Sequence, residues 1–300
     1  MPEKPIAFIF PAFVTEYPED PFLGIPGLKV YRTYLRKAAN SVDPELLNFN
    51  FSARNFLEDE LRTQYMTYIL CCAYADFLKT KDISPAICAG YSMGIYAAAY
   101  QAGSISFPDG LLLIRTAFLE IIRFTAGKRY GMGTVLGLTQ EDIHKLMAEK
   151  SIVEVANQNN PVSFIFSGAL EEVRSILDLA LNEGALNIHL LNVSIPYHSK
   201  ILEETKEPFG KFIESIPFKD PETPVMSMID QSEITDAVTL KKEIVQNLYT
   251  PLNWYQTQLH LQNSGIRSFI ECGPGKTLVK NAKFVEGDSR FYSLASLFVS

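Results

Sequence analysis

The sequence predicts an α/β protein in which a smaller unit is inserted into a larger one. Apolar strand-like runs alternate with helical patterns in the first part of the chain, as in a parallel α/β fold. The middle of the chain has the order β-α-β-β-α-β, which is that of a ferredoxin-like unit. Towards the C-terminus, strand-like runs alternate with helical patterns again. A chain of 300 residues, 47% of them hydrophobic, can bury a core of this size.

Hydrophobic patterning defines the elements of the first part. The first apolar run ends at Pro11, as expected for a short buried strand. Gly127 and the glycines that follow it interrupt the pattern, so we expect a boundary near residue 127. The expected elements are strands over 6–10 and 86–89 and helices over 57–79, 93–101 and 107–124.

Capping and turn residues delimit the inserted unit. Thr139 and Asp142 have the spacing of a capping box at a helix start, and Gly184 stops a later helix. Turn-forming residues from Asn157 to Pro161 predict the loop of a β-hairpin. The expected elements are strands over 133–138, 153–156, 163–167 and 187–193, a helix from 139 and a helix over 170–182. The small ferredoxin-like unit then spans 127–194, and the large unit comprises 1–126 and 195–300.

The last part of the chain has α/β character again. A Gly-Pro-Gly turn directly follows its last expected strand. The expected elements are helices over 199–213, 240–248 and 254–263 and strands over 225–228 and 269–271.

Composition excludes several classes of function. A net charge of -7 and a pI near 5.3 argue against a general nucleic-acid or anionic membrane surface and favour small molecules or a protein partner. The four cysteines lie in apolar stretches without paired spacing, so we expect buried free thiols, no metal site and a reducing cytoplasm. The N-terminal apolar run is too short for a secretory signal, and polar residues and glycines interrupt the longest uncharged stretch, so no membrane segment is expected.

The stretch AGYSMGI, residues 89–95, fits the pattern G-x-S-x-G. Between a buried strand and a buried helix, this pattern predicts a sharp turn that presents Ser92 as a nucleophile. The backbone N–H of Met93 would then be an oxyanion donor. The alternative interpretation is that Ser92 is a small polar residue at a buried bend, because so loose a pattern also arises by chance.

A reactive serine needs a base, and His198 is the best candidate. It lies where a strand leaves the inserted unit and a helix begins, so it can face the cleft between the two units. The other three histidines lie within predicted helices or a strand and are interpreted as surface or packing residues. No aspartate between Ser92 and His198 has an obvious route to the site, so we expect a dyad whose histidine is oriented by a backbone carbonyl.

Seven segments, in order along nearly the whole chain, resemble the malonyl-CoA:acyl carrier protein transacylases and the acyltransferase domains of polyketide synthases. They are FIFP, GYSMG, AGSISFPDGL, ANQNNPVSFIFSG, VSIPYHS, NLYTPLNW and ECGPGKTL. The resemblance implies an α/β-hydrolase-like large domain with a ferredoxin-like small one, which agrees with the order of elements above.

The resemblance also implies a ping-pong reaction. Ser92 would attack an acyl-CoA thioester, His198 would act as base and then acid, and the phosphopantetheine of an acyl carrier protein would accept the acyl group. The carbonyl of Thr250 would orient the histidine ring. No permanently bound cofactor is implied.

The sequence departs from the family pattern at three places. The family's GQGSQ loop after the first strand is replaced by AFVTE, so the second oxyanion N–H would come from Phe13. Tyr91 replaces the histidine before the nucleophile and, with Tyr197, is expected in the wall of the acyl pocket. Ala117 holds the place of the arginine that pairs with the malonyl carboxylate, and Arg115 should point away from the site, because two residues span about 200° of a helix.

Without that arginine, a buried malonyl carboxylate would be unpaired, and an unpaired buried charge is strongly disfavoured. The expected acyl group is therefore uncharged, either acetyl or a longer apolar chain. Two alternatives stay open: an acyl-thioester hydrolase on the same scaffold, and a non-catalytic protein that binds carrier proteins.

Overall fold

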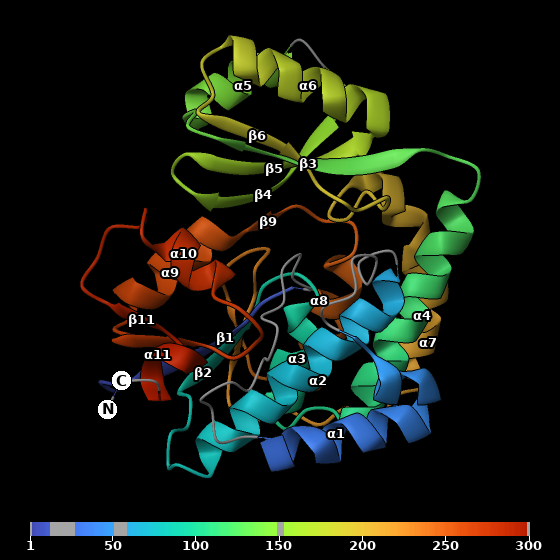
Figure 1. Cartoon of the computed structure of the whole chain (residues 1–300), viewed down its shortest axis with the longest axis vertical. Coiled ribbons are helices and arrows are strands. Elements are labelled where there is room, and N and C mark those ends of the chain that lie inside the picture. Colours follow the sequence, from blue (N-terminus) through green and yellow to red (C-terminus); the bar gives the residue numbers. More distant parts are fainter. Residues whose placement is uncertain (1, 13–27, 51–58, 149–152, 299–300) are drawn as a thin grey trace.

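Two β-sheets organise the molecule. A computed structural model describes residues 2–12, 28–50, 59–148 and 153–298. In Figure 1 the smaller sheet, with helices on its outer face, lies at one end of the longest axis, and the larger sheet with its surrounding helices forms the other end.

The larger sheet has the strand order β11-β10-β1-β2-β7-β8. Its paired strands are parallel except for β8, which is antiparallel to β7. Side chains alternate along β1: Phe8 and Phe10 enter one hydrophobic core and Ala7 and Ile9 another, so the strand is buried on both faces, as parallel sheets require. The strands are β1 (Ile6–Phe10), β2 (Ile87–Gly90), β7 (Val225–Met226), β8 (Glu233–Ile234), β10 (Ser268–Glu271) and β11 (Arg290–Ser293).

The helices of this larger part pack around the sheet (Figure 1). The α2 helix begins at Glu60, later than expected, because the Asp59 side chain caps it by accepting from the N–H of Arg62. The expected helix over 199–213 is divided into the 3₁₀ helix η3 and helix α7. The elements are α1 (Leu28–Ser41), η1 (Pro44–Asn48), α2 (Glu60–Lys79), α3 (Gly94–Gln101), α4 (Phe107–Thr125), η3 (Lys200–Thr205), α7 (Lys206–Glu214), α8 (Ala237–Gln246), α9 (Trp254–Asn263), α10 (Thr277–Ala282) and α11 (Leu294–Phe298).

The smaller sheet has the order β6-β3-β5-β4-β9. Its first six elements follow the expected sequence β-α-β-β-α-β, and a separate core around Phe164 and Phe166 joins the sheet to its helices. The elements are β3 (Tyr130–Leu136), α5 (Gln140–Ala148), β4 (Val153–Asn160), β5 (Ser163–Ala169), α6 (Leu170–Asn182), β6 (Asn187–Leu190) and β9 (Leu252–Asn253).

The hairpin loop predicted over Asn157–Pro161 is wrong. Strand β4 continues to Asn160, and the turn is confined to residues 161–162. The asparagine side chains that suggested a loop are buried, and those of Asn157 and Asn159 are hydrogen-bonded, so a strand can hold them.

Strand β9 is the one strand of the smaller sheet that comes from outside the predicted insertion. It pairs in parallel with β4, Asn157 opposite Leu252 and Gln158 opposite Asn253. The division of the chain at 126/127 and 194/195 into two domains stays a prediction. No helix among the described segments combines the length and apolar character needed to cross a membrane.

Candidate active site

Ser92 lies on a sharp turn between β2 and α3. Its φ angle is 54°, in the left-handed region, and the turn is closed by the N–H of Gly94, which donates to the carbonyl of Tyr91 at 2.9 Å. A Cβ atom at Gly94 would lie 2.1 Å from the carbonyl oxygen of Phe10. Glycine at this position therefore lets the helix start approach β1 closely, with Ser92 held at the end of the sheet.

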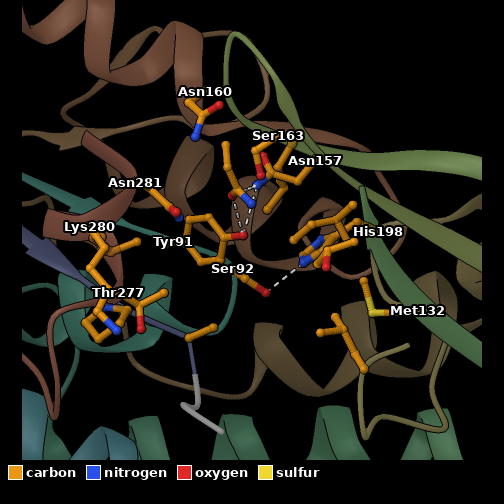
Figure 2. Close-up of a pocket in the computed structure, with 18 of the residues that line it drawn as sticks. Tyr91, Ser92, Met132, Asn157, Asn160, Ser163, His198, Thr277, Lys280 and Asn281 are labelled. Atoms are coloured by element: carbon orange, nitrogen blue, oxygen red, sulfur yellow. Dashed lines mark hydrogen bonds between the residues drawn. The ribbon is translucent and has the colours of Figure 1, made fainter. Parts of the chain in front are cut away.

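The structure brings Ser92 and His198 together. Ser92 Oγ lies 2.6 Å from His198 Nε2, and His198 Nδ1 lies 2.6 Å from the carbonyl oxygen of Asn247 (Figure 2). Because a carbonyl only accepts, Nδ1 carries the ring proton in the neutral imidazole, and Nε2 is left to accept from the serine hydroxyl.

Burial lowers the pKa of His198 to about 4, although its hydrogen bond to Asn247 acts in the opposite direction. The ring is thus neutral at neutral pH. This is the state that a base needs before it takes a proton from Ser92.

The carbonyl that accepts from His198 Nδ1 belongs to Asn247 and not, as predicted, to Thr250. Asn247 directly follows α8, and carbonyls at a helix end have no partner within the helix. Thr250 instead uses its N–H to bond the carbonyl of Gln246. A helix predicted to end near Gln246 would have pointed to the free carbonyl of Asn247 as the acceptor.

The oxyanion donors predicted at Met93 and Phe13 have different outcomes. Met93 precedes α3, and its N–H donates to no acceptor within the described segments, so it is available to a ligand oxygen. Phe13 lies outside the described residues.

Cysteines and metal ligands play no visible part at this site. The four cysteines are buried and free. Among the residues placed in the structure, no cluster of three or more histidine, cysteine, aspartate or glutamate side chains could hold a metal ion.

Two chambers meet at the Ser92–His198 pair. The large chamber has a volume of about 420 Å³ and lies between the two sheets. Its wall is mostly apolar and includes Met132, Leu191 and Leu252, while exposed residues such as Lys280 mark its opening to the surface. Figure 2 shows Lys280 and Thr277 on the side of the chamber away from His198.

Tyr91 lines the large chamber and is bonded to the smaller sheet. Its hydroxyl donates to Asn159 Oδ1 at 2.8 Å and accepts from Asn157 Nδ2 at 2.9 Å. Asn157 Oδ1 in turn accepts from the N–H of Trp254 at 3.0 Å. These two asparagines were not among the predicted site residues, because their sequence resembled a turn.

The small chamber, of about 30 Å³, contains Ala117. Tyr197 lines both chambers, whereas Arg115 is exposed and lines neither. The described residues around the small chamber include no lysine or arginine. They are Gln64, Ser92, Met93, Tyr96, Ala117, Ile121, Tyr197, His198, Asn247 and Leu248.

Comparison with known proteins identifies relatives of this chain. The family model described as the acyl transferase domain matches residues 55–285. A malonyl CoA-acyl carrier protein transacylase of Bacillus subtilis is 29% identical over 210 residues, which cover 69% of this chain and 66% of that protein.

Two solved structures have the same fold. A malonyl-CoA:acyl carrier protein transacylase from Xanthomonas oryzae superposes with a TM-score of 0.90 and 24% identity, covering 99% of this chain and 96% of that one. A malonyl-transacylase in complex with a type II polyketide synthase acyl-carrier protein superposes with a TM-score of 0.88 and 22% identity, covering 96% of this chain and 95% of that one. The predicted fold, an α/β-hydrolase-like large part with a ferredoxin-like small one, is confirmed.

Proposed function

Because this chain belongs to the acyl transferase domain family, we propose that it moves an uncharged acyl group from coenzyme A to an acyl carrier protein. The observation that carries the proposal is the 2.6 Å contact between Ser92 Oγ and His198 Nε2, with Nδ1 held by a carbonyl. Such a pair can remove a proton from serine at neutral pH. The relatives described above are named for the same two carriers, coenzyme A and acyl carrier protein.

In the first half-reaction Ser92 Oγ attacks the thioester carbonyl while His198 Nε2 takes the hydroxyl proton. The N–H of Met93 stabilises the oxyanion, and the C–S bond then breaks as the coenzyme A sulfur leaves with the proton from His198. In the second half-reaction the phosphopantetheine thiol gives its proton to His198 and attacks the acyl-serine. The proton returns to Ser92 Oγ as the ester bond breaks.

The acyl group is where we propose that this chain departs from its relatives. Ala117 lines the small chamber beside Ser92, and no described cation lines it with Ala117. A carboxylate that entered this chamber would lose its hydration without gaining a charged partner. An acyl group without a carboxylate avoids this cost.

Intact-protein mass spectrometry after incubation with acyl-CoAs tests the proposal. We expect acetyl-CoA to acylate the wild type faster than malonyl-CoA, and Ser92→Ala to abolish the mass increase. Adding holo carrier protein should discharge the acyl-enzyme onto the carrier. A clear malonyl preference would exclude the uncharged acyl group, rapid discharge to water alone would indicate a hydrolase, and absence of any acyl-enzyme would indicate a binding protein.

A further inference from the structure

The small chamber is the more buried end of the site. Ser92, Tyr197 and His198 line both chambers, and every other described residue around the small one is buried. The large chamber, by contrast, reaches exposed residues of α10. Among the described residues, the large chamber therefore offers a pantetheine arm its way in from the surface, and the small chamber is left for the acyl group.

The volume of the small chamber limits the length of that group. At about 30 Å³, against about 420 Å³ for the large chamber, it has room for only a few non-hydrogen atoms. These are the atoms beyond the acyl carbonyl, whose carbon is bonded to Ser92 and whose oxygen faces the Met93 N–H.

Hydrogen-bond donors at the wall of this chamber are turned towards Glu60. The Tyr197 hydroxyl donates to Glu60 Oε1 at 2.7 Å, which uses its only proton. Gln64 Nε2 lies 3.2 Å from the same oxygen and 3.0 Å from the Tyr197 hydroxyl, to both of which it donates. Glu60 thus fixes the amide of Gln64, whose Oε1 accepts no hydrogen bond from the described residues.

Glu60 also adds negative charge to this end of the site. It is partly buried and forms no ion pair with any residue placed in the structure. Arg62, two residues away, is bound to Asp43 and Asp59 instead. Burial raises the pKa of Glu60 above its ordinary value, and the hydrogen bonds donated by Tyr197 and Gln64, which favour the carboxylate, offset part of this rise.

Building on the proposed acyl transfer at Ser92, we propose that the small chamber binds a short acyl group whose far end is an uncharged or cationic hydrogen-bond donor. Glu60 sets this preference. A hydroxyl or ammonium group would meet Gln64 Oε1 and the field of the Glu60 carboxylate, both of which favour a donor. A carboxylate would meet an acceptor and a like charge, which disfavours it independently of the missing arginine.

Three thioesters with the same number of non-hydrogen atoms test this proposal: butyryl-CoA, 3-hydroxypropionyl-CoA and β-alanyl-CoA. The rate of acyl-Ser92 formation would be measured for each by rapid quench and intact mass. We expect at least one of the two donor-bearing groups to react roughly ten times faster than butyryl, the factor that one buried hydrogen bond contributes. The faster of the two identifies the donor. Equal rates, or a faster butyryl group, would overturn the proposal.

The variant Glu60→Gln keeps the shape of the side chain and removes its charge. We expect it to lower the ratio of donor-bearing to butyryl rates by roughly ten-fold. Glu207→Gln is the matched control, because Glu207 is an exposed carboxylate paired with Lys211. An unchanged ratio in Glu60→Gln would remove Glu60 from the proposal.

Failure of this inference is distinguishable from failure of the proposed function. If none of the three thioesters acylates Ser92 and acetyl-CoA also fails, acyl transfer itself is wrong. If all three acylate Ser92 equally and pass the group to a carrier protein, acyl transfer stands and the donor preference is wrong.

Discussion

At the scale of single residues, the site depends on backbone conformations that are costly for ordinary side chains. Ser92 and His198 have φ angles of 54° and 59°, in a region that disfavours side chains with a Cβ atom. Each such residue costs on the order of 1–3 kcal/mol. The surrounding backbone holds both: the Ile95 N–H bonds the Ser92 carbonyl, and the His198 N–H bonds the Leu248 carbonyl. Strain at both members of one pair indicates that the fold stabilises their positions.

The low pKa of His198 predicts an unusually acidic limit to activity. The reaction needs the neutral imidazole, so kcat/KM should stay constant as pH falls and then decrease ten-fold per pH unit below the His198 pKa of about 4. A stopped-flow measurement of acyl-enzyme formation with acetyl-CoA from pH 3.5 to 8 would locate this limit. A decrease that begins near pH 6.5, the value of an unperturbed histidine, would contradict the effect of burial.

The sequence predicted correctly that the side chains of Ser92 and His198 lie together, but not which backbone carbonyl contacts the histidine. Ser92 and His198 were singled out by motif and position, and Ala117 by counting from Ser92 without gaps. The acceptor at His198 Nδ1 was misassigned to Thr250, because the direction of a carbonyl depends on where a helix ends. That end is fixed by local capping contacts that spacing does not reveal.

At the scale of elements, the turn at Ser92 requires close approach of α3 to β1. A Cβ atom on residue 94 would meet the Phe10 carbonyl, which also accepts from the Tyr91 N–H at 2.8 Å. Gly94→Ala should therefore displace backbone rather than a movable side chain. We expect a loss of about 1–3 kcal/mol in the free energy of unfolding, measured by urea denaturation, together with loss of acyl-enzyme formation.

Gly210→Ala is the control for this prediction. Gly210 lies inside helix α7, and apart from its chain neighbours and its own helix backbone no described atom lies within 4 Å of the position that its Cβ would occupy. Alanine there should stabilise the protein by up to about 1 kcal/mol and leave acylation unchanged. If Gly94→Ala behaved like Gly210→Ala, the close approach would not matter for the fold.

Most periodic elements were predicted from the sequence, although helix α1 was missed, and elements that depend on distant contacts were not predicted. The order of strands and helices through residues 130–190 followed from periodicity and capping residues. The short β9 strand was missed, because its two residues become a strand only by pairing with β4. Likewise, the predicted strand over 153–156 ends too early, because asparagines are typical of turns and only their buried hydrogen-bond partners show that they lie in β4.

At the scale of the whole molecule, polar contacts join the two sheets directly beside the nucleophile. Tyr91 comes from the turn after β2, Asn157 from β4 and Trp254 from the start of α9. Asn157 is 2% exposed and bonds both of the others, so it ties the larger sheet, the smaller sheet and the C-terminal segment together. The large chamber lies where these parts meet, and its shape depends on their relative position.

Asn157→Leu tests this connection, since leucine has a similar size but no hydrogen-bonding groups. The buried N–H of Trp254 would lose its acceptor, and we expect a loss of about 1–3 kcal/mol in the free energy of unfolding. Acylation of Ser92 should also slow, because Tyr91 adjoins the serine and would lose one of its two bonds to the smaller sheet. Urea denaturation and intact-mass kinetics measure the two effects.

The control for Asn157→Leu is the same substitution at Asn281, which lines the same chamber but whose side chain bonds no described residue. Because no buried group loses a partner there, stability should change by less than about 0.5 kcal/mol. Equal losses in the two variants would mean that the polarity of the chamber wall matters, rather than the link between sheets. A stable but slow Asn157→Leu variant would instead show that the link positions Tyr91 without holding the sheets together.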